Sequence, residues 1–125
     1  MAAPVIMIID DSQTIRRSAE MFLSKEGYDV RAFDDGFEGL SAIEEVGPAM
    51  IFMDLMMPGL DGYQTARLLK SNPKFASIPI VILSSKDGLF DRAQSKLAGC
   101  EEHLAKPFTK NALVEAVARH VKAIA

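Results

Sequence analysis

The sequence predicts an α/β fold in which five short parallel strands form one doubly wound sheet with helices on both faces. Three apolar runs, at 5–9, 49–53 and 80–83, are too short for helices and are typical of strands buried on both faces. Segments with helical periodicity lie between them. This regular alternation of strands and helices favours a parallel sheet over other architectures.

Two weaker candidates complete the sheet. The runs at 29–33 and 102–105 carry more polar residues than the other three, as edge strands or strands with one polar face do. The strands are therefore expected, in chain order, at 5–9, 29–33, 49–53, 80–83 and 102–105.

Capping residues and apolar spacing place helices in the intervening segments. Asp35 and Glu38, and likewise Asp61 and Gln64, have the spacing of an N-cap and an N3 residue. Gly99 stands where the fourth helix would end. Apolar stripes mark the first, fourth and last helices: Ile15, Ala19, Phe22 and Leu23; Phe90, Ala93 and Leu97; and Leu113, Ala116, Val117, His120, Val121 and Ile124.

Length and composition exclude several classes of protein. The chain has 125 residues, 49% hydrophobic and 25% charged, which is typical of one globular domain. Its net charge of −3 lacks the basic excess of nucleic-acid-binding proteins, so we expect no nucleic-acid partner. The single cysteine, Cys100, cannot form an internal disulfide bond. Neither a signal peptide nor an apolar stretch of about 18 residues is evident, so we expect a cytoplasmic protein without membrane insertion.

The most informative polar residues stand at the ends of the predicted strands. Asp10 and Asp11 end the first strand, Asp54 the third, Ser84 the fourth and Lys106 the last. Open parallel α/β sheets bind ligands outside the carboxyl ends of their strands. Each residue alone has an ordinary explanation, such as a helix cap or a solvated lysine. Their joint placement predicts one site with three carboxylates, a hydroxyl and an ammonium group.

This combination of groups suits phosphoryl chemistry. Three neighbouring carboxylates repel one another, and a hard divalent cation such as Mg²⁺ relieves that repulsion. Lys106 would add a second positive charge opposite Asp54. A carboxylate beside a metal ion and a lysine can act as a nucleophile toward phosphorus, and both positive charges would offset the charge on the transferred group. Ser84 would donate a hydrogen bond to that group once it is attached.

Three segments carry a resemblance to a known family. They are Ile-Ile-Asp-Asp-Ser at 8–12, Met-Asp-Leu-Met-Met-Pro-Gly-Leu-Asp-Gly at 53–62 and Lys-Pro-Phe at 106–108. In order and spacing they resemble the receiver domain of bacterial two-component response regulators, over essentially the whole chain. The resemblance implies a flavodoxin-like (βα)5 fold and a single receiver domain over residues 1–125 without an effector domain. It also implies no enzyme activity beyond the chain's own phosphotransfer and dephosphorylation.

The resemblance assigns roles to the site residues. Asp54 would accept a phosphoryl group from a histidine kinase or a histidine phosphotransfer domain. Asp11, Asp54 and the backbone carbonyl of Met56 would ligate Mg²⁺, and Asp10 would do so directly or through a metal-bound water. Met56 and Lys86 stand at positions that influence hydrolysis of the acyl phosphate in this family. With an apolar residue and a lysine there, we predict slow self-dephosphorylation.

Further residues would transmit the signal. Lys106 would pair with Asp54 and then with the phosphate, and its bond to Pro107 is typically cis in the family. Ser84 would be the switch hydroxyl, drawn toward the phosphate with its loop. The family's second switch position usually carries Tyr or Phe but here carries His103, whose charge can change near neutral pH. We therefore predict pH-sensitive or weakly coupled switching, unless His103 is a partly exposed edge residue without that role.

Phosphorylation would act on the surface formed by the fourth helix, the last strand and the last helix, where a downstream protein would bind. Segments 11–17, 61–65 and 84–91 resemble the stand-alone receivers of the chemosensory pathway that controls type IV pilus twitching motility. That pathway is the expected context. Candidate contact residues are Phe108, Lys110, Glu115, Arg119 and Lys122.

Three other interpretations remain. A phosphate sink or relay intermediate would share the fold but have no output partner of its own. A phosphatase of the haloacid-dehalogenase type needs an Asp two residues after its nucleophile, but Met56 follows Asp54 there and Ser12 follows Asp10. A flavodoxin-like nucleotide or flavin binder needs a first loop that receives a phosphate, which Asp10 and Asp11 would repel.

Overall fold

The computed structural model describes residues 3–86 and 88–121. Strands and helices alternate along this part of the chain, and no helix within it is long and apolar enough to cross a membrane. The strands are β1 (Val5–Ile9), β2 (Asp29–Phe33), β3 (Met50–Asp54), β4 (Ile80–Ser84) and β5 (Glu102–Ala105). The helices are α1 (Gln13–Lys25), α2 (Gly36–Val46), α3 (Gly62–Lys70), α4 (Leu89–Leu97) and α5 (Lys110–His120).

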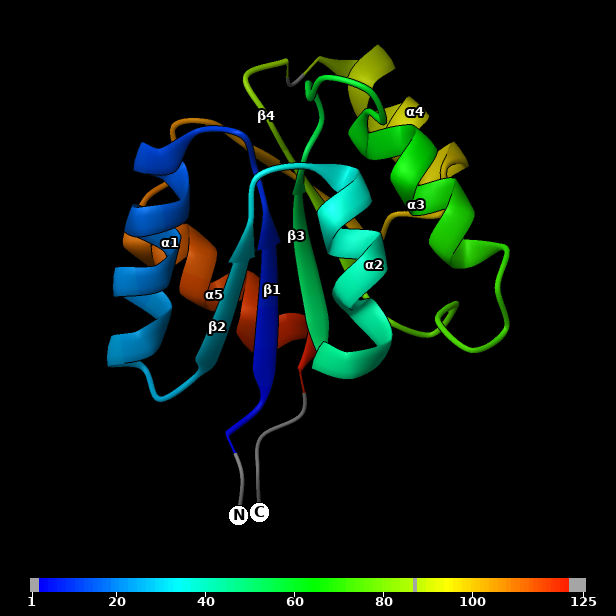
Figure 1. Ribbon diagram of the computed structural model, residues 1–125. Helices are drawn as coiled ribbons and strands as arrows, with labels where there is room; N and C mark the ends of the chain where they lie inside the picture. The colour runs from blue at the N-terminus through cyan, green and yellow to red at the C-terminus, as the bar shows by residue number, and fades with distance from the viewer. Residues whose placement is uncertain (1–2, 87, 122–125) are drawn as a thin grey trace.

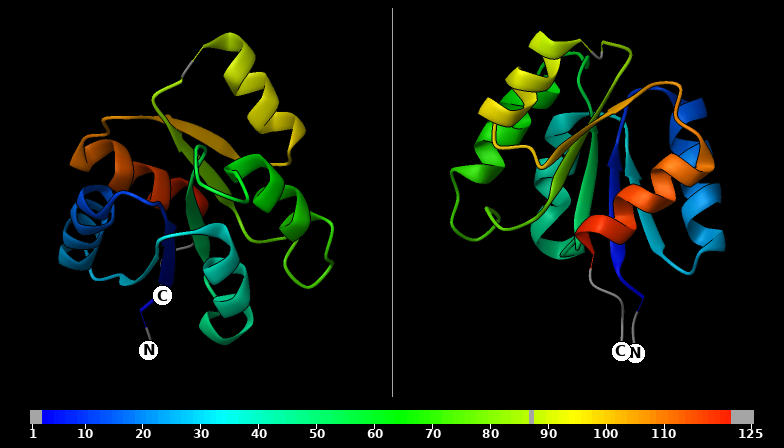
Figure 2. Two further views of the ribbon diagram at one scale, coloured as in Figure 1. Left: turned by 45° about the horizontal axis from the view of Figure 1, so that its top comes forward. Right: turned by 180° about the vertical axis from the view of Figure 1, so that it is seen from behind.

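The five strands form one parallel sheet in the order β2-β1-β3-β4-β5 (Figure 1). Helices α1 and α5 cover one face, and α2, α3 and α4 cover the other (Figure 1 and Figure 2). This arrangement confirms the predicted doubly wound, flavodoxin-like fold. The two most polar strands, β2 and β5, lie at the edges of the sheet as predicted.

The sheet divides the hydrophobic core into two layers, because the central strands are buried on both faces. One layer packs against α2 and α3, and the other against α1 and α5. Met7, Met50 and Met53 are fully buried and belong to the core. Burial raises the pKa of the Cys100 thiol to about 12, consistent with a packing role for that residue.

The predicted starts of the second and third helices are confirmed. Asp35 accepts a hydrogen bond from the backbone N–H of Glu38 at 2.8 Å and so caps α2. Asp61 and Gln64 form a reciprocal capping box at the start of α3. Each such cap stabilises its helix by about 1 kcal/mol.

Strands β3 and β4 each extend one residue beyond the predicted end. Asp54 and Ser84 are therefore the last residues of their strands rather than the first residues after them. The sheet ladder continues past both, since Leu55 N–H donates to the Leu83 carbonyl at 3.0 Å and Lys106 N–H donates to the Ser84 carbonyl at 2.9 Å. Both functional side chains are consequently anchored in the sheet.

The last helix ends earlier than its apolar stripe suggested. Helix α5 stops at His120, and Val121 has an extended backbone with φ −110° and ψ 123°. Val121 still packs against the core, which explains why its position continued the stripe. Ile124 and Lys122 lie outside the described residues.

The predicted apolar stripe of α4 faces solvent rather than the core. The helix is present, and Gly99 follows it with φ +89°, in the left-handed region expected after a helix end. Phe90 and Leu97 are 73% and 84% exposed, and Ala93 is exposed as well. The buried residue of this helix is instead Ser95. Helical spacing shows which side chains share a face, but not which face the sheet covers.

Candidate functional site

Three carboxylates meet at the carboxyl edge of the sheet, as predicted. Asp10 follows β1, Asp11 is the next residue, and Asp54 ends the neighbouring strand β3. One carboxylate oxygen from each residue lies within 4.8 Å of the other two. Asp10 and Asp54 are 0% and 5% exposed, whereas Asp11 is exposed. Two of the three acidic groups are thus withdrawn from water and the third borders it.

Lys106 joins this cluster from the end of β5. Its Nζ lies 3.0 Å from Asp54 Oδ1, as predicted, and 2.8 Å from Asp10 Oδ2, which sequence reasoning did not foresee. The bond between Lys106 and Pro107 is cis, in agreement with the family resemblance. The ammonium group is therefore shared between two buried carboxylates.

The carboxylate of Asp10 has one oxygen without a hydrogen bond. Oδ1 accepts from the backbone N–H of Ser12 at 2.9 Å, and the backbone carbonyl accepts from Arg16 at 2.7 Å. Oδ2 has the Lys106 ammonium as an ion-pair partner at 2.8 Å but accepts no hydrogen bond. Buried carboxylate oxygens normally have a hydrogen-bond donor or a cation as partner. This oxygen, with the neighbouring carboxylates, fits a hard divalent cation such as Mg²⁺.

Burial dominates the electrostatics of Asp54. It raises the pKa of Asp54 to about 6, although the hydrogen bond from Lys106 opposes the rise and the charge of Asp10 adds to it. For Lys106, burial lowers the pKa, but the negative charges of Asp10 and Asp54 outweigh it and hold the pKa above its ordinary value. The lysine is thus charged at neutral pH, while burial makes ionisation of Asp54 less favourable than it is in water.

A glycine lets α3 begin directly against this site. A Cβ on Gly62 would lie 2.6 Å from the carbonyl oxygen of Asp54 and 3.0 Å from Cα of Leu55. Both are backbone atoms that cannot rotate away, so any side chain would displace the end of β3. The N–H of Gly62 also donates to the Leu55 carbonyl at 2.9 Å. This close approach fixes the backbone that carries Asp54.

The predicted hydroxyl lies at the adjacent strand end. Ser84 ends β4, the neighbour of β3, and is 2% exposed. Its Oγ accepts a hydrogen bond from the backbone N–H of Lys86 at 3.0 Å, and a serine hydroxyl that accepts in this way can still donate. The side chain of Lys86 is exposed, and Met56, in the loop after β3, is 61% exposed. The two predicted modulating side chains therefore border solvent.

His103 is not partly exposed, so that part of one interpretation is wrong. It is 7% exposed, with Nδ1 2.7 Å from Ser95 Oγ and Nε2 2.7 Å from the carbonyl oxygen of Lys86. Sequence reasoning missed Ser95 entirely. No local pattern marks it, because it is one polar residue of a helix whose apolar stripe was expected to face the core. Its role emerges only when α4 and β5 are placed side by side.

Comparisons with known proteins agree with this geometry. Residues 6–118 match the family described as the response regulator receiver domain. The chain is 52% identical to Protein PilG of Pseudomonas aeruginosa, over 93% of this chain and 86% of PilG. It is 31% identical to Protein PilH of the same organism, over 90% of this chain and 93% of PilH.

Solved structures show the same fold. The chemotaxis protein CheY4 of Vibrio cholerae has a TM-score of 0.91 at 25% identity, over 96% of this chain and 100% of that one. The receiver domain of the Francisella response regulator 1452 has a TM-score of 0.84 at 28% identity, over 91% of this chain and 93% of that one. Sequence, fold and the acidic site at the strand ends agree, and the chain belongs to the receiver domain family as a response regulator of two-component signalling.

Proposed function

We propose that this response regulator accepts a phosphoryl group on Asp54, in a Mg²⁺-dependent reaction, from a histidine kinase or a histidine phosphotransfer domain. The main support is the placement of the Asp54 carboxylate, 3.0 Å from Lys106 Nζ and beside two further carboxylates. A carboxylate as buried as that of Asp54, with no positive charge nearby, would favour the protonated form, which is a poor nucleophile. A lysine and a cation site beside it favour the ionised form.

The acidic side chains form the proposed metal site. Asp10, Asp11 and Asp54, with the backbone carbonyl of Met56, would hold the ion. When bound, Mg²⁺ would neutralise part of the charge of the carboxylates and of the phosphoryl oxygens.

The chain's own residues then have distinct tasks in the transfer. An Asp54 oxygen forms a bond to phosphorus while the phosphorus–nitrogen bond of the donor histidine breaks, and the released imidazole takes a proton from solvent. Lys106 offsets the negative charge of the incoming group from its position 3.0 Å from Asp54. Ser84 accepts from the Lys86 N–H and therefore keeps its own hydrogen for a phosphoryl oxygen.

Phosphoryl uptake from a small donor tests this proposal. Intact mass after exposure to acetyl phosphate and Mg²⁺ should increase by one phosphate in the native chain and remain unchanged in Asp54→Ala. Omission of Mg²⁺, with EDTA present, should also prevent the increase. An increase of the same size in Asp54→Ala would show that another residue is the acceptor and would overturn the assignment.

The position two residues after Asp54 carries no acid or base for turnover of an external phosphate ester. The residue two positions after Asp54 is Met56, which can act neither as a general acid nor as a general base. We therefore propose that the chemistry of this chain is confined to its own phosphorylation and dephosphorylation.

Met56 should slow hydrolysis of the acyl phosphate. Because its thioether side chain cannot orient an attacking water, Met56→Asn is expected to increase the dephosphorylation rate about 3- to 10-fold, the effect of one added hydrogen bond. Intact mass followed over time, after removal of acetyl phosphate, gives the rate. Met56→Leu is the matched control and should resemble the native chain. An Asn variant that is no faster would refute this role.

We propose that α4, β5 and α5 form the surface that binds a downstream protein. Leu89, Phe90 and Leu97 of α4 are 88%, 73% and 84% exposed. Large apolar side chains gathered on one short helix mark a protein contact more often than isolated ones do. On α5, Lys110 and Glu115 are exposed and available for contact.

Two other candidate contact residues are engaged within the chain. Arg119 pairs with Glu102 of β5 through both Nε and Nη2. Phe108 is partly buried and packs against the core layer next to α5. These two residues are therefore better suited to holding β5 and α5 together than to binding a partner.

A binding experiment separates an output protein from a phosphate sink. The immobilised chain, loaded with Mg²⁺ and beryllofluoride as a phosphoryl mimic, should retain a protein that the unloaded chain does not. Leu97→Ser should reduce this recovery about tenfold, because it removes an exposed apolar side chain from the proposed contact. Leu68→Ser is the control, since Leu68 is 50% exposed on α3. Equal retention by loaded and unloaded chains would favour the sink.

We propose pilus-driven twitching motility as the biological context. The segments at 11–17, 61–65 and 84–91 resemble the receivers of that pathway, and the 52% identity to PilG supports the same assignment. A phosphoryl donor of the histidine kinase type also places the proposed reaction in the cytoplasm.

A further inference from the structure

A shallow groove runs along helix α2, beside the end of the edge strand β2. Its volume is about 440 Å³, and six residues line it: Phe33, Phe37, Glu38, Ser41, Ala42 and Glu45. Five of the six belong to α2, where steps of three or four residues place them on one face of the helix. The groove therefore follows the axis of α2 for about two helical turns.

An exposed aromatic ring supplies the apolar part of this groove. Phe37 is 57% exposed. Its ring rests on Gly59 in the loop after β3, since a Cβ on that glycine would lie 2.8 Å from ring atom Cε2. Because this contact already holds the ring, little side-chain freedom is lost when a partner covers it. Aromatic side chains held in this way are typical anchors of protein interfaces.

The charged residues of the groove are both acidic. Glu38 and Glu45 are exposed and lie seven residues apart on α2, a rise of about 10 Å along the helix. The surrounding sequence is equally one-sided, because residues 32–66 contain seven acidic residues and no Lys, Arg or His. An apolar centre between two negative charges favours a partner that presents apolar and positively charged side chains.

Basic side chains beside α2 have partners outside the groove. Arg31 of β2 bonds to Asp29 at 3.2 Å, and Lys74 pairs with Glu44 on another face of α2. Arg16 of α1 donates to a backbone carbonyl at 2.7 Å. The negative charge of the groove is therefore available to a partner.

Carboxylate repulsion is strongest at the Glu38 end. The pKa of Glu38 is raised by a hydrogen bond with Asp34 and by the charge of that residue. Burial and Asp35 add to this rise in pKa, and Arg16 opposes it. A positively charged group from a partner would relieve the repulsion.

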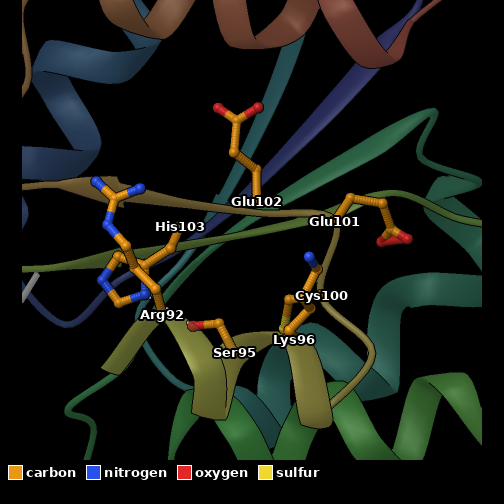
Figure 3. A pocket seen from close by; sticks show the side chains of 7 residues that line it. All are labelled: Arg92, Ser95, Lys96, Cys100, Glu101, Glu102 and His103. Atoms are coloured by element: carbon orange, nitrogen blue, oxygen red, sulfur yellow. Dashed lines mark hydrogen bonds between the residues drawn. The ribbon is translucent and has the colours of Figure 1, made fainter. Parts of the chain in front are cut away.

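The hollow between α4 and β5 has a different chemistry. Figure 3 shows the basic Arg92 and Lys96 of α4 around the same hollow as the acidic Glu101 and Glu102. With both signs of charge present, that hollow does not select a partner by charge alone. The groove along α2 has one sign of charge and therefore discriminates between partners.

We propose that the groove along α2 docks a helix of another protein that carries Lys or Arg at positions i and i+7, with apolar side chains at i+3 and i+4. The apolar side chains cover Phe37, and the two basic ones reach Glu38 and Glu45. A helix fits better than an extended chain, because two helices packed side by side repeat their contacts at the same spacing. Strands β2 and β5 lie at opposite edges of the sheet, so this surface is separate from the one formed by α4, β5 and α5.

An NMR titration of the full chain with two synthetic peptides tests this proposal. Each peptide is an Ala-rich helix of about 18 residues with Leu at i+3 and i+4; one has Lys at i and i+7, and the other has Glu there. The Lys peptide should shift the amides at 37–45 and that of Gly59, and the Glu peptide should bind at least about tenfold more weakly. Raising NaCl from about 50 mM to about 500 mM should weaken the Lys peptide several-fold. Equal binding of both peptides, or no shift at 37–45 with about 1 mM Lys peptide, would overturn the proposal.

Charge reversal provides a test that a folding defect cannot imitate. In the double variant Glu38→Lys with Glu45→Lys, the preference should invert, so that the Glu peptide binds at least about tenfold more tightly than the Lys peptide. Phe37→Ser should weaken the Lys peptide about tenfold. The matched control is Glu20→Lys with Glu115→Lys, which reverses two exposed charges outside the groove and should keep the native preference. A groove variant that still prefers the Lys peptide would show that these carboxylates do not select the partner.

A second copy of this chain is the alternative occupant. Arg17, Met21 and Lys25 share an exposed face of α1, but their basic residues are spaced by eight positions rather than seven. NMR spectra of the chain without peptide, recorded at increasing protein concentration, should show no shifts at 37–45. Concentration-dependent shifts there that disappear in Met21→Ser would assign the groove to a second copy and overturn the proposal of a different partner.

Discussion

Replacing Asp54 by asparagine is expected to raise the free energy of unfolding of the metal-free protein by about 2 to 3 kcal/mol at pH 8. Burial raises the pKa of Asp54 from 3.8 to about 6, so the folded protein holds this proton more tightly than the unfolded chain does. Between these two values the folded state binds more protons, and its stability falls as the pH rises. Above this window the unfavourable buried charge is fully present, and asparagine removes it.

The pH dependence distinguishes this cause from better packing. Below about pH 4 the carboxyl group of Asp54 is uncharged in the folded protein, so the variant should gain almost nothing there. Denaturant unfolding in EDTA at pH 4 and pH 8 measures both values. Asp29→Asn is the control, because the side chain of Asp29 is 42% exposed, and its effect should stay within about 0.5 kcal/mol. An equal gain at both pH values would argue against charge burial.

Replacing Lys106 by methionine is expected to lower the free energy of unfolding by about 3 kcal/mol at pH 7 in the absence of metal. The ammonium lies 2.8 Å from Asp10 and 3.0 Å from Asp54, and its loss leaves two buried carboxylates without this cation. Although burial lowers the pKa of Lys106, the two neighbouring carboxylates raise it above the ordinary value of 10.5. The stabilisation from Lys106 is therefore complete at neutral pH and is lost only as the pH rises above that range.

The loss of unfolding free energy in Lys106→Met should be smaller at pH 5 than at pH 7. Without the hydrogen bond that opposes the effect of burial, Asp54 takes up a proton at higher pH, which removes one of the two uncompensated charges. Chemical unfolding in EDTA at pH 5 and pH 7 is the measurement. Lys74→Met is the matched control, since Lys74 and Glu44 form an exposed pair that water and salt screen, so little stability should be lost. Similar losses in both lysine variants would mean that Lys106 does not stabilise the buried carboxylates.

Much of the fold could be predicted because its signals are local. The apolar runs at 5–9, 49–53 and 80–83 had to be strands, since they are too short for helices and too apolar for loops. Alternation with helices then implied a parallel sheet, and parallel strands all end at one edge. The same rule predicts that Asp10, Asp54 and their neighbours lie close together. The one-residue errors at the ends of β3 and β4 arose because a polar residue can still belong to the ladder.

The orientation of α4 could not be predicted in the same way. Its spacing correctly indicated a helix, but the natural assumption that apolar residues face the core placed Phe90 and Leu97 on the wrong side. A helix usually docks through its apolar face, and α4 departs from this because Ser95 finds a hydrogen-bonding partner in His103. A conflict between the apolar pattern of a helix and the face that it buries is expected at functional surfaces.

Residues close together in the chain were enough to predict the order of strands and helices, the caps that start α2 and α3, and the set of polar groups at the strand ends. It is the packing of separate elements that places Lys106 between two buried carboxylates and lets His103 connect the loop after β4 to α4. These contacts depend on the distances between side chains from separate elements. Periodicity and motif spacing contain no information about such distances until the sheet is assembled.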